Sequence, residues 1–170
     1  MDDPRFGPIR IPAKDVANDL GKYIEFRKSI INVNKIVNDQ NPLIFHNRLD
    51  HLTYAYSHSP RNTTSVEFGV YKGDSLLHLA KISNMPVWGF DSFSGFAKGS
   101  PWFHSENMNR IEYNLPIELM EYKYLVKGYF EDTLVPWLKN SNIQEIGFVH
   151  YDAGHYEATK YVLEKIENHL

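Results

Sequence analysis

The stretch SVEFGVYKGDS, residues 65–75, contains the end of a strand, a turn and the start of a helix, and it decides the fold. β-Branched and aromatic residues predict a buried strand over residues 63–70, and an apolar stripe predicts a helix over residues 74–83. Gly69 and Gly73 lie between them, where the chain must turn sharply or let a ligand approach. Unpaired amides and the helix dipole suit such a corner to bind an anion, whether phosphate or carboxylate.

The glycine spacing of this turn differs from the dinucleotide fingerprint. Tyr71 and Lys72 fill its middle, so the pattern is acid-x-Gly-x-x-x-Gly, led by Glu67. A plain strand-to-helix turn explains this pattern equally well. The run VWGFD, residues 87–91, adds a second signal, because it is a short apolar strand that ends in a carboxylate. In a βαβ unit Asp91 is placed to accept hydrogen bonds from both hydroxyls of a ribose, so the two stretches together predict a nucleoside site.

Two further strand and helix pairs follow along the chain. Strands are predicted over residues 122–129 and 145–152, and helices over residues 131–140 and 156–170. This alternation predicts an α/β fold, a Rossmann-like parallel sheet with flanking helices. Because parallel strands end at one edge of the sheet, the ligand crevice is expected where four residues converge: Gly69, Asp91, Gly128 and Asp152.

The chain before the sheet is expected to form a separate segment. We divide the chain into an N-terminal arm and helical lid, residues 1–60, and a Rossmann-like domain, residues 61–170. Helices are predicted over residues 13–38 and 43–56. The loop 92–102 is rich in Gly, Ser and aromatic residues, and a loop of this kind at the carboxyl edge of a sheet is expected to close over a ligand.

The composition narrows the classes of function. A net charge of −3 gives no electrostatic case for a nucleic-acid partner. No apolar run is long enough to predict a membrane span, and the first residues do not open a signal peptide. The chain has no cysteine, which excludes disulfides, thiolate nucleophiles and cysteine-type zinc sites. These features are compatible with a cytoplasmic enzyme.

Four motifs carry a resemblance to a known family. They are VEFGVYKGDS at 66–75, FDSFSGF at 90–96, GYFEDTL at 128–134 and DAGHYEAT at 152–159. In this order they resemble the motifs of class I S-adenosylmethionine-dependent methyltransferases. More narrowly, the sequence resembles the macrocin O-methyltransferase (TylF-type) family of metal-dependent sugar O-methyltransferases.

The resemblance implies a cofactor, a reaction and a set of binding residues. The cofactor is S-adenosyl-L-methionine, and the reaction is methyl transfer to a hydroxyl oxygen of a small molecule such as a sugar. Glu67 and the glycine turn would hold the methionine end, Asp91 the ribose, and the turn 128–130 with its neighbours the adenine. The implied cofactor-binding residues are Glu67, Phe68, Gly69, Tyr71, Gly73, Ser75, Asp91, Ser92, Phe93, Gly128, Tyr129 and Phe130.

The same resemblance points to the catalytic centre and to two departures from the family pattern. Asp152 matches the family's first metal-binding carboxylate, which implies Mg²⁺ there, and the candidate bases are His104 and His155. The family often has a second acid where Gly154 stands. Its pattern also continues with further strands, the next of which ends in two acids that complete the metal site. This chain stops at Leu170, so we expect a sheet without those last strands.

Each candidate residue also has a plainer interpretation. Asp152 can end a strand and cap the next helix, Glu67 can be a buried structural acid, and His155 can cap the last helix. His104 can be an ordinary loop histidine. The alternative function is a non-catalytic or truncated S-adenosylmethionine-binding or assembly domain, which would form a homo-oligomer through an exposed sheet edge. A nicotinamide-dependent oxidoreductase is disfavoured by the filled glycine turn.

Overall fold

The computed structural model describes Leu43 and residues 45–95 and 115–170. The chain divides into two compact units, Met1–Ile44 and Phe45–Leu170, and the architecture below is that of the second. The predicted arm, the helices over 13–38, most of the 92–102 loop and His104 lie outside the described residues. Of the helices that are described, none is both long and apolar enough to cross a bilayer.

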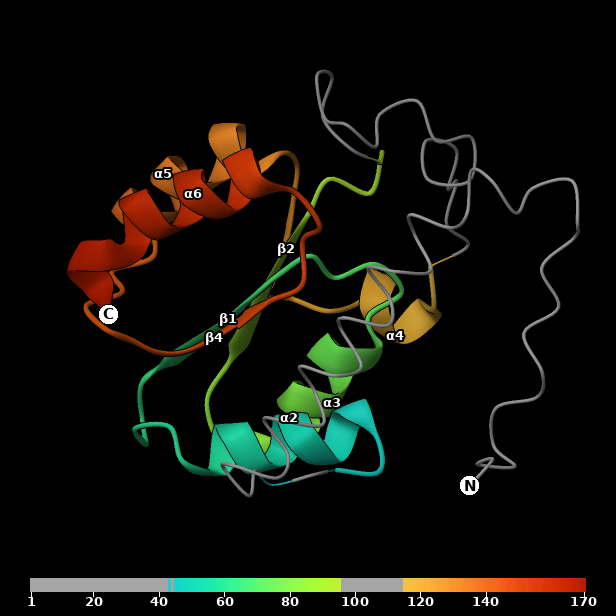
Figure 1. Ribbon diagram of the computed structural model, residues 1–170. Coiled ribbons are helices and arrows are strands. Elements are labelled where there is room, and N and C mark those ends of the chain that lie inside the picture. The colour runs from blue at the N-terminus through green and yellow to red at the C-terminus, as the bar shows by residue number, and fades with distance from the viewer. Residues whose placement is uncertain (1–42, 44, 96–114) are drawn as a thin grey trace, which may run out of the picture. The chain divides into compact units, whose positions relative to one another are not determined.

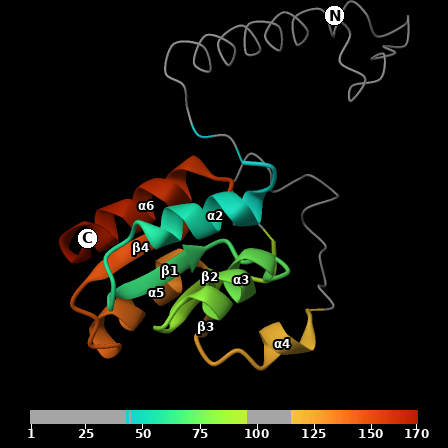
Figure 2. The ribbon, with the colours of Figure 1, turned by 90° about the horizontal axis from the view of Figure 1, so that it is seen from below.

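Four parallel strands form one sheet. They are β1 (Thr64–Phe68), β2 (Val87–Asp91), β3 (Leu125–Lys127) and β4 (Ile146–Tyr151), in the spatial order β3-β2-β1-β4. Figure 2 shows them side by side in this order. The prediction of an α/β fold with a parallel sheet is confirmed. The chain moves outward from β1 to β3 and then returns to the other side of β1, so β1 and β4 flank the point where the strand order reverses.

Helices cover both faces of the sheet. α5 (Phe130–Asn140) and α6 (Tyr156–Ile166), which continues into the short 3₁₀ helix η1 (Glu167–His169), lie on one face. α2 (Arg48–Ser57) and α3 (Asp74–Ile82) lie on the other face, with the single turn α4 (Ile117–Met120) near them (Figure 1). The helices predicted over residues 74–83, 131–140 and 156–170 are present as α3, α5 and α6 with η1, whereas α4 was not predicted. A further helix predicted from residue 105 to before residue 115 lies outside the described residues.

The face under α5 and α6 is a continuous aromatic core. The rings of Phe68 and Phe90 lie 5.1 Å apart, and Phe90 meets Trp137 edge-on at 5.0 Å. Phe130, at the start of α5, meets Phe68 edge-on at 5.4 Å. Edge-to-face pairs at such separations are favourable beyond the area that they bury. Alternation along β1 directs Val66 and Phe68 into this core, and both are fully buried.

The opposite face is built from aliphatic side chains and two polar links between helices. Leu76 and Leu79 of α3 are fully buried against Val87 and Leu119. The hydroxyl of Thr53 and Nε2 of His78 lie 2.7 Å apart, and Tyr56 donates a hydrogen bond to the Ser83 hydroxyl at 2.6 Å. These links join α2 to α3. α2 belongs to the same compact unit as the sheet, Phe45–Leu170, whereas the sequence places its residues in the predicted N-terminal segment 1–60.

Strand β3 is shorter than predicted. It has three residues, Leu125–Lys127, where the sequence predicted 122–129. Two tyrosines that precede β3 form hydrogen bonds with β2. The Tyr122 hydroxyl donates to the Val87 carbonyl at 2.8 Å, and the Tyr124 carbonyl accepts from the Gly89 amide at 3.0 Å. α4 and the turn after it bring these tyrosines to the sheet.

Candidate functional site

A cavity of about 470 Å³ lies at the carboxyl ends of the strands. Its walls come from the turns that follow β1, β2, β3 and β4 and from the first residues of the helices after them. The lining residues are 69–72, 74–75, 91–92, 95, 128–131, 152–155, 158 and Arg48. All four residues that the sequence predicted to converge are among them: Gly69, Asp91, Gly128 and Asp152. Its volume falls in the usual range for a small-molecule site.

Gly69 allows the ends of β1 and β4 to meet. Its φ of +93° lies in the left-handed region, and a Cβ atom there would stand 2.6 Å from the carbonyl oxygen of Asp152. The Asp152 amide donates to the Phe68 carbonyl at 2.8 Å, and the Gly69 amide donates to the Phe90 carbonyl at 2.9 Å. The first glycine of the motif is therefore required both for the turn and for close approach of two backbones.

Asp91 holds the glycine turn through its carboxylate. Oδ2 accepts hydrogen bonds from the amides of Val70 and Tyr71, both at 2.8 Å, and Oδ1 accepts from the amide of Phe93 at 2.8 Å. A carboxylate offers about four acceptor positions, so the bonds from the described residues leave one, on Oδ1. Asp91 lines the cavity and can accept one ligand hydroxyl there, although the sequence had suggested direct bonds to both hydroxyls of a ribose.

Glu67 lies beneath the cavity rather than in its wall. The side chain is fully buried, Ser75 donates a hydrogen bond to Oε1 at 3.0 Å, and Nδ1 of His150 lies 2.8 Å from Oε2. Burial raises the pKa of the Glu67 carboxyl above its ordinary value, while the bonds from His150 and Ser75 oppose that rise. This arrangement is the buried structural acid that the sequence left open, and it fixes the Ser75 side chain, which does line the cavity.

The sequence did not identify His150 as a site residue. It pairs in register with Glu67 across β1 and β4, and it lies two positions before Asp152, which directly follows the end of β4. The sequence held one signal for this pair: an acid and a histidine stand at the same distance from the ends of two strands that are adjacent in the sheet.

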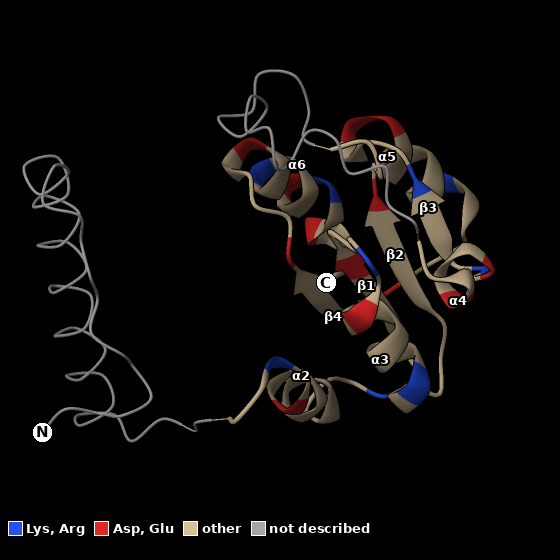
Figure 3. Cartoon of the chain, turned by 90° about the vertical axis from the view of Figure 1, so that its right-hand side faces the viewer, with Lys and Arg blue, Asp and Glu red and all other residues tan. Residues whose placement is uncertain are grey.

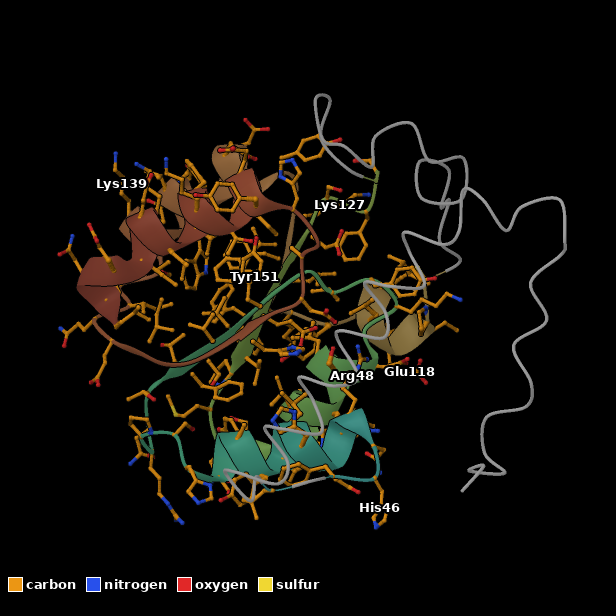
Figure 4. All side chains as sticks on the ribbon, viewed as in Figure 1. His46, Arg48, Glu118, Lys127, Lys139 and Tyr151 are labelled. Carbon is orange, nitrogen blue, oxygen red and sulfur yellow. The ribbon has the colours of Figure 1, made fainter. Side chains whose placement is uncertain are left out.

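Asp152 is paired with Arg48, which the sequence also did not identify. Nη1 of Arg48 lies 3.1 Å from Oδ2 of Asp152, and both side chains are about half exposed, at 55% and 51%. Arg48 begins α2, and it lines a recess together with residues of α3, near which Figure 4 shows it. The two residues are separated by 104 positions, so no local pattern pointed to the pair.

The geometry of His155 favours the capping interpretation. Its Nδ1 accepts a hydrogen bond from the Ala158 amide at 3.2 Å, which caps the start of α6. This bond occupies the lone pair of Nδ1. His155 lines the cavity, but as a base it would have to give up this bond.

The remaining predicted residues divide between the wall and the interior. Besides the residues already discussed, the cavity wall includes four more of the predicted cofactor-binding residues: Tyr71, Ser92, Tyr129 and Phe130. Phe68, Gly73 and Phe93 do not line it. Phe68 is part of the aromatic core, and Gly73 adopts a φ of +87° as the N-cap residue of α3.

The charged residues of the cavity wall are mostly acidic. In the described part of the wall there are four carboxylates, Asp74, Asp91, Glu131 and Asp152, and two cationic side chains, Arg48 and Lys72. In Figure 3 the carboxyl end of β2, where Asp91 stands, is coloured as acidic. A wall of this composition favours a ligand with positive charge over a pyrophosphate.

The described residues do not form a ready-made metal site around Asp152. Within residues 45–95 and 115–170, no three His, Cys, Asp or Glu side chains are close enough to hold a metal. The charged partner of Asp152 is the Arg48 guanidinium. The Mg²⁺ that the resemblance implies at Asp152 therefore stays a prediction.

A parallel sheet with a cavity at the carboxyl ends of its strands is typical of α/β proteins that bind ligands at that edge. Comparison of the chain with models of known protein families, with curated proteins and with solved structures found no match.

Proposed function

We propose that the chain binds S-adenosyl-L-methionine in this cavity and transfers its methyl group to a hydroxyl oxygen of a small molecule. The observation that carries the proposal is the convergence of the Gly69 bend and the Asp91 carboxylate on one open cavity at the point where the strand order reverses. This is the position at which α/β sheets bind nucleoside cofactors.

The charge of the cavity supports this cofactor over a dinucleotide. S-adenosylmethionine carries a sulfonium and an ammonium against one carboxylate, so its net charge is positive, whereas a dinucleotide brings a negatively charged pyrophosphate. The four carboxylates of the wall favour the first and repel the second.

The residues around the cavity suggest how the cofactor would be held. No described side chain caps the start of α3, so the amides of its first turn are available to the amino-acid carboxylate. The free acceptor position of Asp91 would take one ribose hydroxyl. The turn of Gly128, Tyr129 and Phe130 would flank the adenine.

Asp152 is the residue that we assign to the acceptor hydroxyl. The cofactor supplies a methyl group bonded to a positively charged sulfur that leaves readily. The protein must then align the acceptor and remove its proton. Asp152 is half exposed at the cavity wall, and its carboxylate would accept the hydroxyl's hydrogen bond and take the proton as the oxygen–carbon bond forms.

Calorimetry with S-adenosylhomocysteine tests the proposal directly. We expect the full chain to bind it, and we expect Asp91→Asn to weaken binding roughly ten-fold or more, because an amide preserves the shape but loses the charged acceptor. Asp132→Asn is the matched control, since Asp132 is an exposed acid in the first turn of α5 that does not line the cavity. Absence of binding by the unmodified chain, with a folded circular dichroism spectrum, would refute the proposal.

The outer edge of β4 favours the second candidate, an assembly domain. Among the described strands β4 pairs only with β1, and five of its six residues are half-buried. An apolar strand edge of this kind can pair with another chain. Light scattering distinguishes the two candidates: a dimer that does not bind S-adenosylhomocysteine would favour assembly, and a monomer would remove it.

A further inference from the structure

A second recess adjoins the cavity on the side of α2 and α3. Its volume is about 330 Å³, and it is lined by Arg48, Leu49, Asp74, Leu77, His78 and Lys81. Arg48 and Asp74 belong to the walls of both the recess and the cavity. Arg48, which contacts Asp152, therefore borders both the recess and the cavity.

The position of Arg48 is not explained by stability. It is the first residue of α2, where the positive end of the helix dipole disfavours a cation. Asn47 caps this end, since its side-chain oxygen accepts from the Asp50 amide at 2.9 Å. The pair with Asp152 is half exposed, and such pairs contribute little to folding. A guanidinium in an electrostatically unfavourable place, beside a ligand cavity, suggests a role in binding.

Arg48 retains most of its hydrogen-bonding capacity. Among the residues that the structure describes, Asp152 is its single hydrogen-bond acceptor, and one guanidinium nitrogen makes the contact. The guanidinium group has five N–H donors arranged to bind an oxyanion through two parallel bonds. The remaining donors can therefore serve a ligand without loss of the contact with Asp152.

The recess combines two cations with the positive ends of two helices. Lys81 is exposed in the last turn of α3, and its side chain lines the recess with Arg48. α2 and α3 begin at Arg48 and Asp74, both in the recess wall. Asp74 opposes an anion, but it is a single carboxylate against the two cations Arg48 and Lys81 in the described wall of the recess. Leu49 and Leu77 add an apolar surface for the remainder of a ligand.

We propose that the methyl acceptor carries an oxyanion, a phosphate or a carboxylate, which binds in this recess against Arg48 and Lys81 while its hydroxyl lies at Asp152. This inference rests on the proposed function, because it names the substrate class of the same site. The Arg48 guanidinium would then bind the oxyanion of the acceptor on one side and keep its contact with the Asp152 carboxylate on the other.

The test uses the full chain saturated with S-adenosylhomocysteine, titrated separately with inorganic phosphate and with acetate and followed by amide chemical shifts. We expect saturable shifts in residues 77–81 with at least one probe. Binding of phosphate identifies a phosphorylated acceptor, and binding of acetate alone identifies a carboxylate. Lys81→Gln and Arg48→Gln should each weaken the bound probe roughly ten-fold, as expected for loss of a charge-assisted bond.

Lys139→Gln is the matched control. Lys139 is exposed in the last turn of α5, as Lys81 is in the last turn of α3, but Figure 4 shows it on the opposite side of the unit from Arg48. Failure of both probes to bind, or equal weakening by Lys81→Gln and Lys139→Gln, would overturn the inference. If S-adenosylhomocysteine binds and the probes do not, the recess assignment fails alone. If S-adenosylhomocysteine does not bind, the proposed function fails with it.

Discussion

The two faces of strand β1 differ sharply in chemistry although both are buried. Val66 and Phe68 enter an all-apolar core, whereas Ser65 and Glu67 on the opposite face are polar and equally inaccessible. The apolar face is held by the packing of aromatic and aliphatic side chains. The polar face carries a carboxylate fixed by Ser75 and His150 just beneath the cavity. A fold can supply its own stability from the first kind of face, so the second kind indicates where a site is being held in position.

The largest effect is expected from the apolar face. Phe68→Ala removes a fully buried ring that contacts Phe90, Phe130 and Tyr151, so we expect a loss of roughly 3–5 kcal/mol in the free energy of unfolding. Urea denaturation measures it. Leu163→Ala is the control, because Leu163 is 48% exposed and its loss should change stability little. A similar loss in both variants would show that the aromatic core is not the main source of stability.

Gly69→Ala tests the turn after β1, where the backbone of Gly69 approaches the backbone of Asp152. The added Cβ would meet the Asp152 carbonyl oxygen at 2.6 Å with φ at +93°, so we expect about 1–3 kcal/mol of destabilisation and loss of S-adenosylhomocysteine binding. Gly154→Ala is the comparison at the same edge, since Gly154 does not have a positive φ. Thermal unfolding and calorimetry report the two effects. Unimpaired ligand binding in Gly69→Ala would contradict the role given to this close approach.

Glu67→Gln tests the polar face through its pH dependence. Burial raises the folded-state pKa of Glu67 above its ordinary value of 4.5, so its favourable contribution is complete below pH 4.5 and is lost as pH rises through the folded-state pKa. Glutamine does not titrate. We therefore expect the variant to gain stability relative to the unmodified protein as pH increases.

Urea midpoints measured for both proteins from acid to neutral pH provide the comparison. The Glu118→Gln variant serves as control, because Glu118 is an exposed acid of α4. Parallel pH profiles for Glu67→Gln and the unmodified protein would mean that Glu67 keeps its ordinary pKa in the fold.

The smallest effect on stability is expected at the exposed pair. Arg48→Gln breaks a contact between two half-exposed side chains, so the free energy of unfolding should fall by less than about 1 kcal/mol, and by less still at high salt. Denaturation at low and high ionic strength measures this. A large, salt-independent loss would show that Arg48 is a structural residue and would weaken its assignment to ligand binding.

Local sequence patterns predicted most of the strands and helices of the fold. The strand β2 was predicted with its observed bounds, and β1, β4 and α5 were each predicted within two residues at either end, because apolar periodicity and glycine turns are local signals. The convergence of Gly69, Asp91, Gly128 and Asp152 followed from the parallel topology. α4 and the start of α2 were missed, since a single turn and a capped start after Asn41-Pro42 leave little periodicity to detect.

The partners of the site residues could not be predicted in the same way. Arg48 reaches Asp152 only because α2 packs on α3, and nothing near residue 48 in the sequence signals it. The engagement of Asp91 with three backbone amides depends on the conformation of two turns, which residue types alone do not determine. The sequence is thus enough to identify a candidate carboxylate, but coordinates are needed to count the acceptor positions that remain open to a ligand.

The bonds of Asp91 tie two loops into one mechanical unit. Val70 and Tyr71 belong to the turn after β1, and Phe93 to the loop after β2, yet one carboxylate anchors all three amides. Loosening either loop breaks bonds that the other depends on, so the corner should open and close as a whole. A ligand hydroxyl at the last acceptor position would then slow solvent exchange at amides that it never touches.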